Sequence, residues 1–385
     1  MTEETATPIT DQHMPAFDAL RGLAILMVIA AHTGLGFAGT FAIYRGTNDP
    51  MGSFDLPSWF KAIIDGGLHG VTLFFVVSAF TLTRQFARRG LTDLPGYALR
   101  RIFRLGPAFW VAALAYAIIT GFSATPGSSG FGITDYVYGL TFAGWLGSPD
   151  AIWVVPGGWS VQTEFVFYIS LPIIVWLARG HAWRAATMLV IAMVIAQVAS
   201  RNAMLVGTWI DMYMTPLIQL PVFLTGVTVA LLPAPNIFSP GFHPIGRLLS
   251  IGLLFTAVVG IPFSPLANWY FATHIQFSLL VGLAAFFAAW QPPDILKSKF
   301  LVAIGTVSYS MYLIHFALLW PMYHTVSWFL PGNGTSAFVV YFATTTALSF
   351  GMSLVSYRWI EQPPRRWIAA RLRARQHSLQ QPVTP

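Results

Sequence analysis

Cysteine is absent from this chain of 385 residues, and charged residues are scarce, at 9%. Without cysteine there can be no disulfide, no thiolate metal ligand and no cysteine nucleophile. A soluble domain usually carries about a quarter charged residues, so this composition excludes an ordinary soluble protein. Hydrophobic residues make up 55% of the chain and the mean hydropathy is +0.63, which is typical of a polytopic membrane protein.

Ten apolar runs are each close to the roughly 20 residues that an α-helix needs to cross a bilayer core. They cover residues 17–37, 66–83, 102–122, 159–177, 184–200, 212–232, 248–263, 270–290, 300–322 and 337–360. The sequence therefore predicts an all-α integral membrane protein with about ten transmembrane helices.

The position of the basic residues predicts the orientation. An eleventh run, Tyr136–Leu146, is short and lies between glycine and proline residues. If it does not cross, both termini are cytoplasmic and nearly all of the 21 Lys and Arg residues are on the cytoplasmic side, as the positive-inside rule requires. We therefore predict that 136–146 is re-entrant or interfacial, and that the protein is a multi-pass component of the inner (plasma) membrane.

This topology divides the chain into three parts. Residues 1–16 form a cytoplasmic tail, 17–363 the membrane domain, and 364–385 a basic cytoplasmic tail. The net charge of +7 then reflects topology and contact with the lipid bilayer, so no nucleic-acid partner is expected.

Ionisable residues within a span are costly and are candidates for function. Arg21 and His32 are eleven residues apart in the first span, which places them on one helix face about 16 Å apart along the axis. An ion pair with Asp18 would also explain Arg21, and a hydrogen bond to a backbone carbonyl would also explain His32.

Glu164 is expected in the outer half of its span, at the same depth as His32. A carboxylate paired with an imidazole fixes its tautomer and stabilises the imidazolium while the ring takes a proton from a hydroxyl. His315 and His69 are expected on the same side as candidate substrate-binding residues. The alternatives are a packing hydrogen bond for Glu164, a core position for His315 and an interfacial position for His69.

Arg101 and Arg104 are three residues apart at the cytoplasmic edge of the third span. Two arginines on one helix face can bind the phosphates of a nucleotide-bearing donor, although any cytoplasmic boundary collects arginines. The nine histidines show no metal-binding spacing, and no bound cofactor is expected.

Six segments resemble the membrane acyltransferase-3 family. The first two are Phe17-Asp-Ala-Leu-Arg-Gly-Leu-Ala24, with Arg21 and His32 at the family spacing, and 70–80, which resembles GV-x-LFFVLSGF but carries Thr72 and Ala79. The others are Arg101-Ile-Phe-Arg104-Leu-Gly-Pro107, Trp159-Ser-Val-Gln-Thr-Glu164-Phe-Val-Phe-Tyr168, Ser308-Tyr-Ser-Met-Tyr-Leu-Ile-His315 and Tyr357-Arg-Trp-Ile-Glu361-Gln-Pro363. They occur in the family order from 17 to 363.

The resemblance implies a stand-alone O-acyltransferase without the outer SGNH-type domain of some members. It implies transfer of an acyl group, usually acetyl, from a cytoplasmic acyl-CoA such as acetyl-CoA to a hydroxyl of a polysaccharide or another acceptor on the outer side. In the family, the residues matching His32 and Glu164 are implicated in catalysis, and those matching Arg101 and Arg104 in donor binding. We expect Arg21 to assist the two arginines. The alternative is a transporter or flippase for a lipid-linked glycan, which would also carry polar residues at membrane depth.

Overall fold

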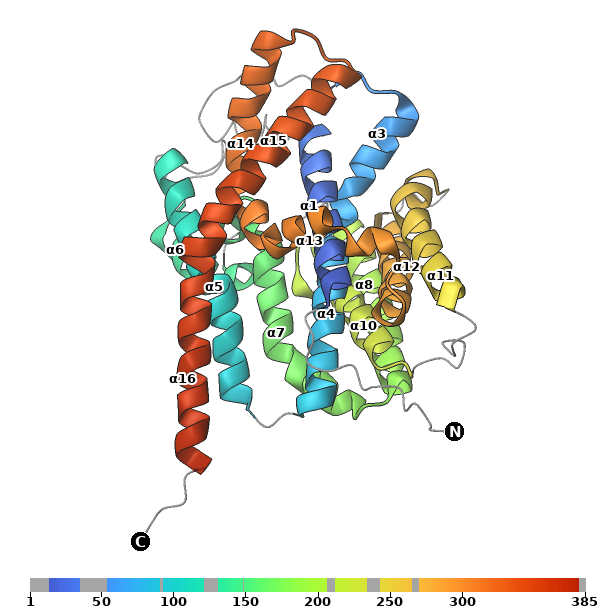
Figure 1. The fold of residues 1–385 in the computed structure, drawn as a ribbon, viewed down its shortest axis with the longest axis vertical. Helices are drawn as coiled ribbons and strands as arrows, with labels where there is room; N and C mark the ends of the chain where they lie inside the picture. The colour runs from blue at the N-terminus through green and yellow to red at the C-terminus, as the bar shows by residue number, and fades with distance from the viewer. Residues whose placement is uncertain are drawn as a thin grey trace.

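The computed structural model describes residues 14–34, 54–90, 93–120, 131–147, 149–205, 212–233, 243–264 and 270–380, and within these ranges every regular element is helical (Figure 1). The long helices are α1 (Pro15–Gly34), α4 (Gly70–Arg89), α5 (Leu94–Thr120), α7 (Gly158–Ala178), α8 (Ala182–Leu205), α10 (Pro216–Ala230), α11 (His243–Phe255), α12 (Tyr270–Trp290), α14 (Ser308–Phe329), α15 (Thr335–Ser356) and α16 (Gln362–Gln380). The shorter ones are α3 (Ser58–Asp65), α6 (Ile133–Leu140) and α13 (Lys299–Thr306).

Eight helical segments of the described chain are long and apolar enough to cross a membrane, and a ninth is added if α13 and α14 are one span. This confirms an all-α polytopic membrane protein, and each of the ten predicted runs falls on a helix. The run at 212–232 forms the apolar helix α10, which has only 15 residues.

The run at 300–322 is not one straight span. A 76° bend separates α13 from α14, so α13 lies across the middle of the bundle while α14 rises beside α15 (Figure 1). The bend lets α13 cross α1 at very short range. A Cβ atom on Gly305 would collide with the backbone of Asp18, and one on Gly22 with the backbone of Leu301. Uniform hydropathy along 300–322 does not encode this change of direction.

Helix α1 is at the centre of the packing. Phe17, Leu20, Ile25 and Ile29 are all less than 2% exposed, and α3, α4, α13, α14 and α15 all contact α1. Helix α8, in contrast, exposes the side chains of Val190, Val194 and Val198. An apolar face that is exposed in the protein itself is suited to contact with lipid chains.

The segment before α7 folds against the bundle without crossing it. Helix α6 has eight residues, far fewer than a span needs. Two 3₁₀ turns follow, η2 (Gly144–Leu146) and η3 (Pro149–Trp153). The side chain of Gln162 accepts a hydrogen bond from the Gly144 amide at 2.7 Å and so ties this segment to α7. The predicted non-spanning character of 136–146 is confirmed for this part of the chain.

The C-terminal helix continues well past the end predicted for the membrane domain. A π-helical turn, η9 (Tyr357–Glu361), joins α15 to α16, which runs to Gln380. The predicted tail at 364–385 therefore begins inside helix α16. Its arginine and alanine residues favour this, because they are strong helix formers. Most of the predicted N-terminal tail, residues 1–13, lies outside the described residues.

Candidate active site

Two buried histidines, one on α1 and one on α14, form a direct pair. Nδ1 of His32 on α1 lies 2.8 Å from Nε2 of His315 on α14. The side chains are 8% and 0% exposed, and both rings contact the ring of Phe316, at centroid distances of 4.5 and 4.3 Å. The sequence predicted both residues as site residues on the same side of the membrane, and the structure brings them together.

The hydrogen bonds of this pair fix its tautomers. Nδ1 of His315 lies 3.2 Å from the carbonyl oxygen of Met311, and a carbonyl oxygen can only accept. In two neutral rings, His315 therefore carries its proton on Nδ1, and its Nε2 accepts from Nδ1 of His32. We assign the lone pair of His32 to Nε2, the nitrogen that a general base would use.

Glu164 is not the partner of His32, contrary to the pairing that the sequence suggested. Its carboxylate accepts a hydrogen bond of 2.5 Å from the hydroxyl of Tyr168, one turn further along α7. Helix α7 begins at Gly158, so Glu164 lies about 9 Å along the helix from its first residue. This depth brings Glu164 to the level of the arginines and away from the histidine pair.

A cavity of about 50 Å³ lies between α1, α4, α5, α7 and α14. Arg21, Arg104 and Glu164 line it together with the hydroxyl-bearing residues Ser78, Ser160, Ser308, Tyr309 and Tyr312. Tyr312 connects the cavity with the histidine pair. Its hydroxyl is 2.8 Å from that of Ser160, and its ring centroid is 5.7 Å from that of His315, one helical turn away.

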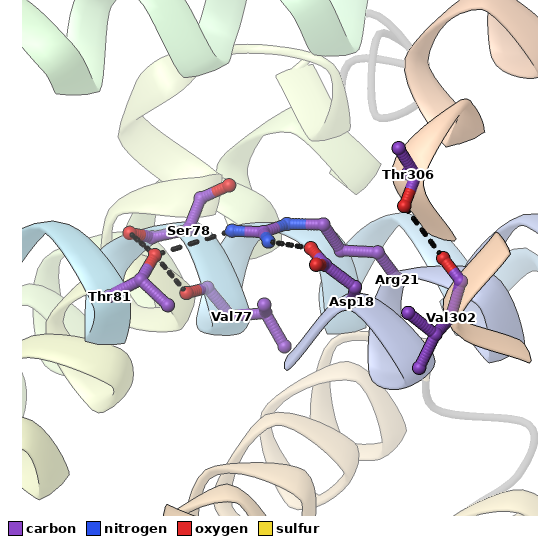
Figure 2. A network of polar contacts seen from close by, with 7 residues as sticks. All are labelled: Asp18, Arg21, Val77, Ser78, Thr81, Val302 and Thr306. Carbon is purple, nitrogen blue, oxygen red and sulfur yellow. Dashed lines mark hydrogen bonds and ion pairs between the residues drawn. The ribbon is translucent and has the colours of Figure 1, made fainter. Parts of the chain in front are cut away.

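The two cations of the cavity are held in different ways. Nη1 of Arg21 donates to Asp18 at 2.9 Å and its Nη2 to Thr81 on α4 at 3.4 Å, so the side chain is fixed between two helices (Figure 2). Arg104 makes no hydrogen bond or ion pair within the part of the chain that the structure describes, although the carboxylates of Glu164 and Glu361 are within electrostatic range. Arg104 is therefore available to an anionic ligand.

Arg101 and Arg104 do not share one cavity. Arg101 lines a separate groove between α5 and α7, and its guanidinium lies 5.4 Å from the ring centroid of Tyr97 and 5.6 Å from that of Tyr168. Tyr168 separates the two sites, because it contacts Arg101 and also hydrogen-bonds Glu164 in the cavity. The i,i+3 spacing correctly places both arginines on one stretch of α5 but does not show that Tyr168 stands between them.

His69 belongs to a second polar cluster. Its ring stacks on Phe277 and lies 6.2 Å from the ring of His274. His274 in turn lies 2.9 Å from the hydroxyl of Thr72 and 3.0 Å from Oε1 of Gln219. These groups join α4, α10 and α12, so the structure does not bring His69 to the His32–His315 pair. In the described ranges, no three His, Asp or Glu side chains are arranged to hold a metal ion.

Glu361 is a buried carboxylate within electrostatic range of Arg104 that the sequence did not single out as a candidate. The π-helical turn at Tyr357–Glu361 directs this carboxylate inward, where it is 3% exposed and accepts a hydrogen bond from the hydroxyl of Ser310. π-Helical turns are frequent at functional sites. Ser310 and Glu361 both belong to segments that resemble the family, and this resemblance is the sequence feature that could have identified them.

Comparison with known proteins identifies the family of the chain. The family model described as an acyltransferase domain matches residues 14–354. The chain belongs to membrane acyltransferase family 3. It is also 24% identical over 275 residues to "Acyltransferase MdmB" from Streptomyces mycarofaciens, an alignment that covers 66% of this chain and 68% of the relative. No solved structure matches the chain. The protein is therefore an acyltransferase with multiple membrane-spanning helices, and the alternative of a transporter or flippase is set aside.

Proposed function

We propose that this family member is an O-acetyltransferase that moves an acetyl group from cytoplasmic acetyl-CoA to a hydroxyl of a carbohydrate at the outer side of the membrane. The observation that carries the proposal is the hydrogen-bonded chain from the Met311 carbonyl through His315 to His32. In the proposal, Nε2 of His32 is the proton acceptor of a buried site beside the cavity that Arg21 and Arg104 line.

In the proposed step, Nε2 of His32 takes the proton of the acceptor hydroxyl as its oxygen attacks the thioester carbonyl. The new C–O bond forms and the C–S bond breaks, and His32 returns the proton to the departing thiolate. His315 accepts a hydrogen bond from Nδ1–H of His32 throughout, so the ring keeps one orientation. Neither imidazole needs a bound cofactor for this step.

Arg104 and Arg21 are proposed to bind the phosphates of the donor. Both guanidinium groups line the cavity, and arginine binds phosphate through two parallel hydrogen bonds. About 16 Å of helix α1 separates Arg21 from His32. An extended pantetheine arm that passes Ser160 and Tyr312 would bring the thioester toward the histidine pair. Glu164 is proposed to position Arg104 through its negative charge.

The carbohydrate acceptor and the acetyl group are inferred from the family resemblance. The hydroxyl groups of Ser78, Ser160 and Tyr309 give the cavity wall a polar surface of the kind that binds other hydroxyl groups. The inner (plasma) membrane is the proposed location, because acyl-CoA is a cytoplasmic donor and the acceptor is expected on the other side.

The test measures thioester turnover by the purified full chain in lipid nanodiscs. The donor is acetyl-CoA labelled in its acetyl group, and a membrane extract of the native host supplies the acceptor. We expect label to move to a carbohydrate fraction, and His32→Ala to reduce this transfer to a low residual rate. His181→Ala is the matched control, because His181 lies on the surface in the turn between α7 and α8. Turnover that is unchanged in His32→Ala would remove His32 from the mechanism, and wild-type protein without any turnover would refute acetyl-CoA as donor.

A further inference from the structure

A second ligand site is indicated by the groove that holds Arg101. The groove has a volume of about 330 Å³, and most of its wall is apolar: Leu94, Ala98, Ile102, Phe165, Ile169, Pro172 and Ile173. Ile169 and Ile173 on α7 are each 61% exposed and Leu94 on α5 is 43% exposed. In a membrane protein these exposed apolar side chains face lipid, so the groove opens sideways into the bilayer.

A cation with unused hydrogen-bond donors lies in this apolar groove. Nε and Nη1 of Arg101 are inaccessible to solvent and have no hydrogen-bond partner in the described chain. Two tyrosine rings hold the guanidinium in place, and the hydroxyl of Tyr97 is itself fixed by a hydrogen bond of 3.0 Å to the carbonyl of Tyr168. A buried charged donor without an acceptor is strongly unfavourable. An acceptor from outside the protein would remove this penalty.

The surroundings favour an anionic acceptor. The groove lies between the first turns of α5 and the middle turns of α7. Arg88, Arg100 and Arg179 lie at or next to the ends of α4, α5 and α7 on this side of the bundle. Arg100 is paired with Asp93 at 3.2 Å, whereas no carboxylate of the described residues pairs with Arg101. The basic residues predict that this end faces the cytoplasmic leaflet, where anionic lipids attract clustered arginines.

We propose that the groove binds an anionic phospholipid of the cytoplasmic leaflet. The lipid phosphate accepts hydrogen bonds from the guanidinium group of Arg101, and an acyl chain lies along Ile169 and Ile173. The phosphate and acyl chain of one molecule match the two features of the groove, its charged end and its apolar wall. This site differs from the cavity of Arg21 and Arg104. The proposal therefore gives Arg101 a lipid ligand in place of the donor phosphates that the family resemblance implied for it.

The test measures lipid binding to the full chain in detergent, by native mass spectrometry and by thermal unfolding with added phosphatidylglycerol or phosphatidylcholine. Wild type is expected to bind phosphatidylglycerol roughly tenfold more tightly than phosphatidylcholine, because the latter carries a cationic group that competes with the arginine. Arg101→Gln should reduce phosphatidylglycerol binding to the level of phosphatidylcholine and abolish the increase in Tm. Arg100→Gln is the matched control and should leave binding unchanged.

A second variant separates loss of the site from loss of the fold. Ala98→Trp keeps the arginine and fills the groove with an indole ring, and Ala98 is already exposed, so the fold should tolerate it. We expect this variant to exclude phosphatidylglycerol while its unfolding remains cooperative. The proposal is wrong if wild type shows no preference for phosphatidylglycerol, or if Arg101→Gln and Ala98→Trp both retain the wild-type preference.

Discussion

His32 derives its proposed role from the hydrogen bond that it makes to a second histidine. The Met311 carbonyl determines that His315 carries its proton on Nδ1. His315 in turn determines that His32 carries its own proton on Nδ1. A lone buried imidazole could change tautomer or rotate. The hydrogen bonds from Met311 through His315 to His32 instead leave Nε2 of His32 as the basic nitrogen. The preorganisation of a base by a second group is a general feature of acyl-transfer sites.

His315→Ala tests this positioning role. The variant removes the acceptor of the His32 Nδ1–H group, so we expect kcat to fall roughly 100-fold while the KM for the acyl donor stays near the wild-type value. The measurement is steady-state transfer at varied donor concentration. A KM that rises with unchanged kcat would instead show that His315 binds substrate.

Arg104→Gln tests the donor site. Because Arg104 faces the cavity without a hydrogen-bond partner among the described residues, we expect its loss to raise the donor KM about tenfold, the effect of losing charged hydrogen bonds to a phosphate. Arg100→Gln removes a neighbouring charge outside the cavity and serves as control. Equal KM values in the two variants would contradict the assignment of Arg104.

At the scale of elements, the crossing of α1 and α13 positions His32 and Arg21 against the rest of the bundle. Gly22 and Gly305 allow the two helices to approach until backbone contacts backbone. The 76° bend after α13 then directs α14 so that His315 reaches His32. Small residues at a helix crossing are typical of membrane proteins.

Gly305→Ala is expected to lower stability by about 1–3 kcal/mol, the usual effect of overpacking a buried contact, because the added methyl group would collide with the Asp18 backbone. Thermal unfolding in detergent measures the effect. Gly351→Ala is the control, since Gly351 is also helical but has open space around its Cα. A Gly305 variant as stable as the Gly351 variant would show that the helices do not cross so closely.

The sequence was informative about helices and less so about contacts between them. Hydropathy placed the helices well, because lipid requires about 20 apolar residues in a row. It missed the bend after Thr306, because uniform hydropathy does not encode a change of direction. It also missed the partner of Glu164, because that depends on how deep α7 begins. Glu361 was missed because a local π-helical turn, invisible in composition, directs it inward.

At the scale of the whole molecule, the absence of cysteine makes the predicted orientation directly testable. Single cysteines can be introduced at Asp93, between α4 and α5, and at Asn333, between α14 and α15. We predict that an impermeant maleimide labels Asn333→Cys in intact cells and Asp93→Cys only after the membrane is opened. The reverse pattern would place the arginine-rich end outside and contradict a cytoplasmic donor.

The central claim is that His32 and His315 act as one unit in acyl transfer, and a double-mutant cycle tests it most directly. The rate of labelled acetyl transfer is compared for wild type, His32→Ala, His315→Ala and the double variant at equal protein level. The two substitutions should be strongly non-additive, with the double variant no slower than His32→Ala, because His315 acts only through His32. Additive losses would show that the histidines act independently and would contradict the proposed mechanism.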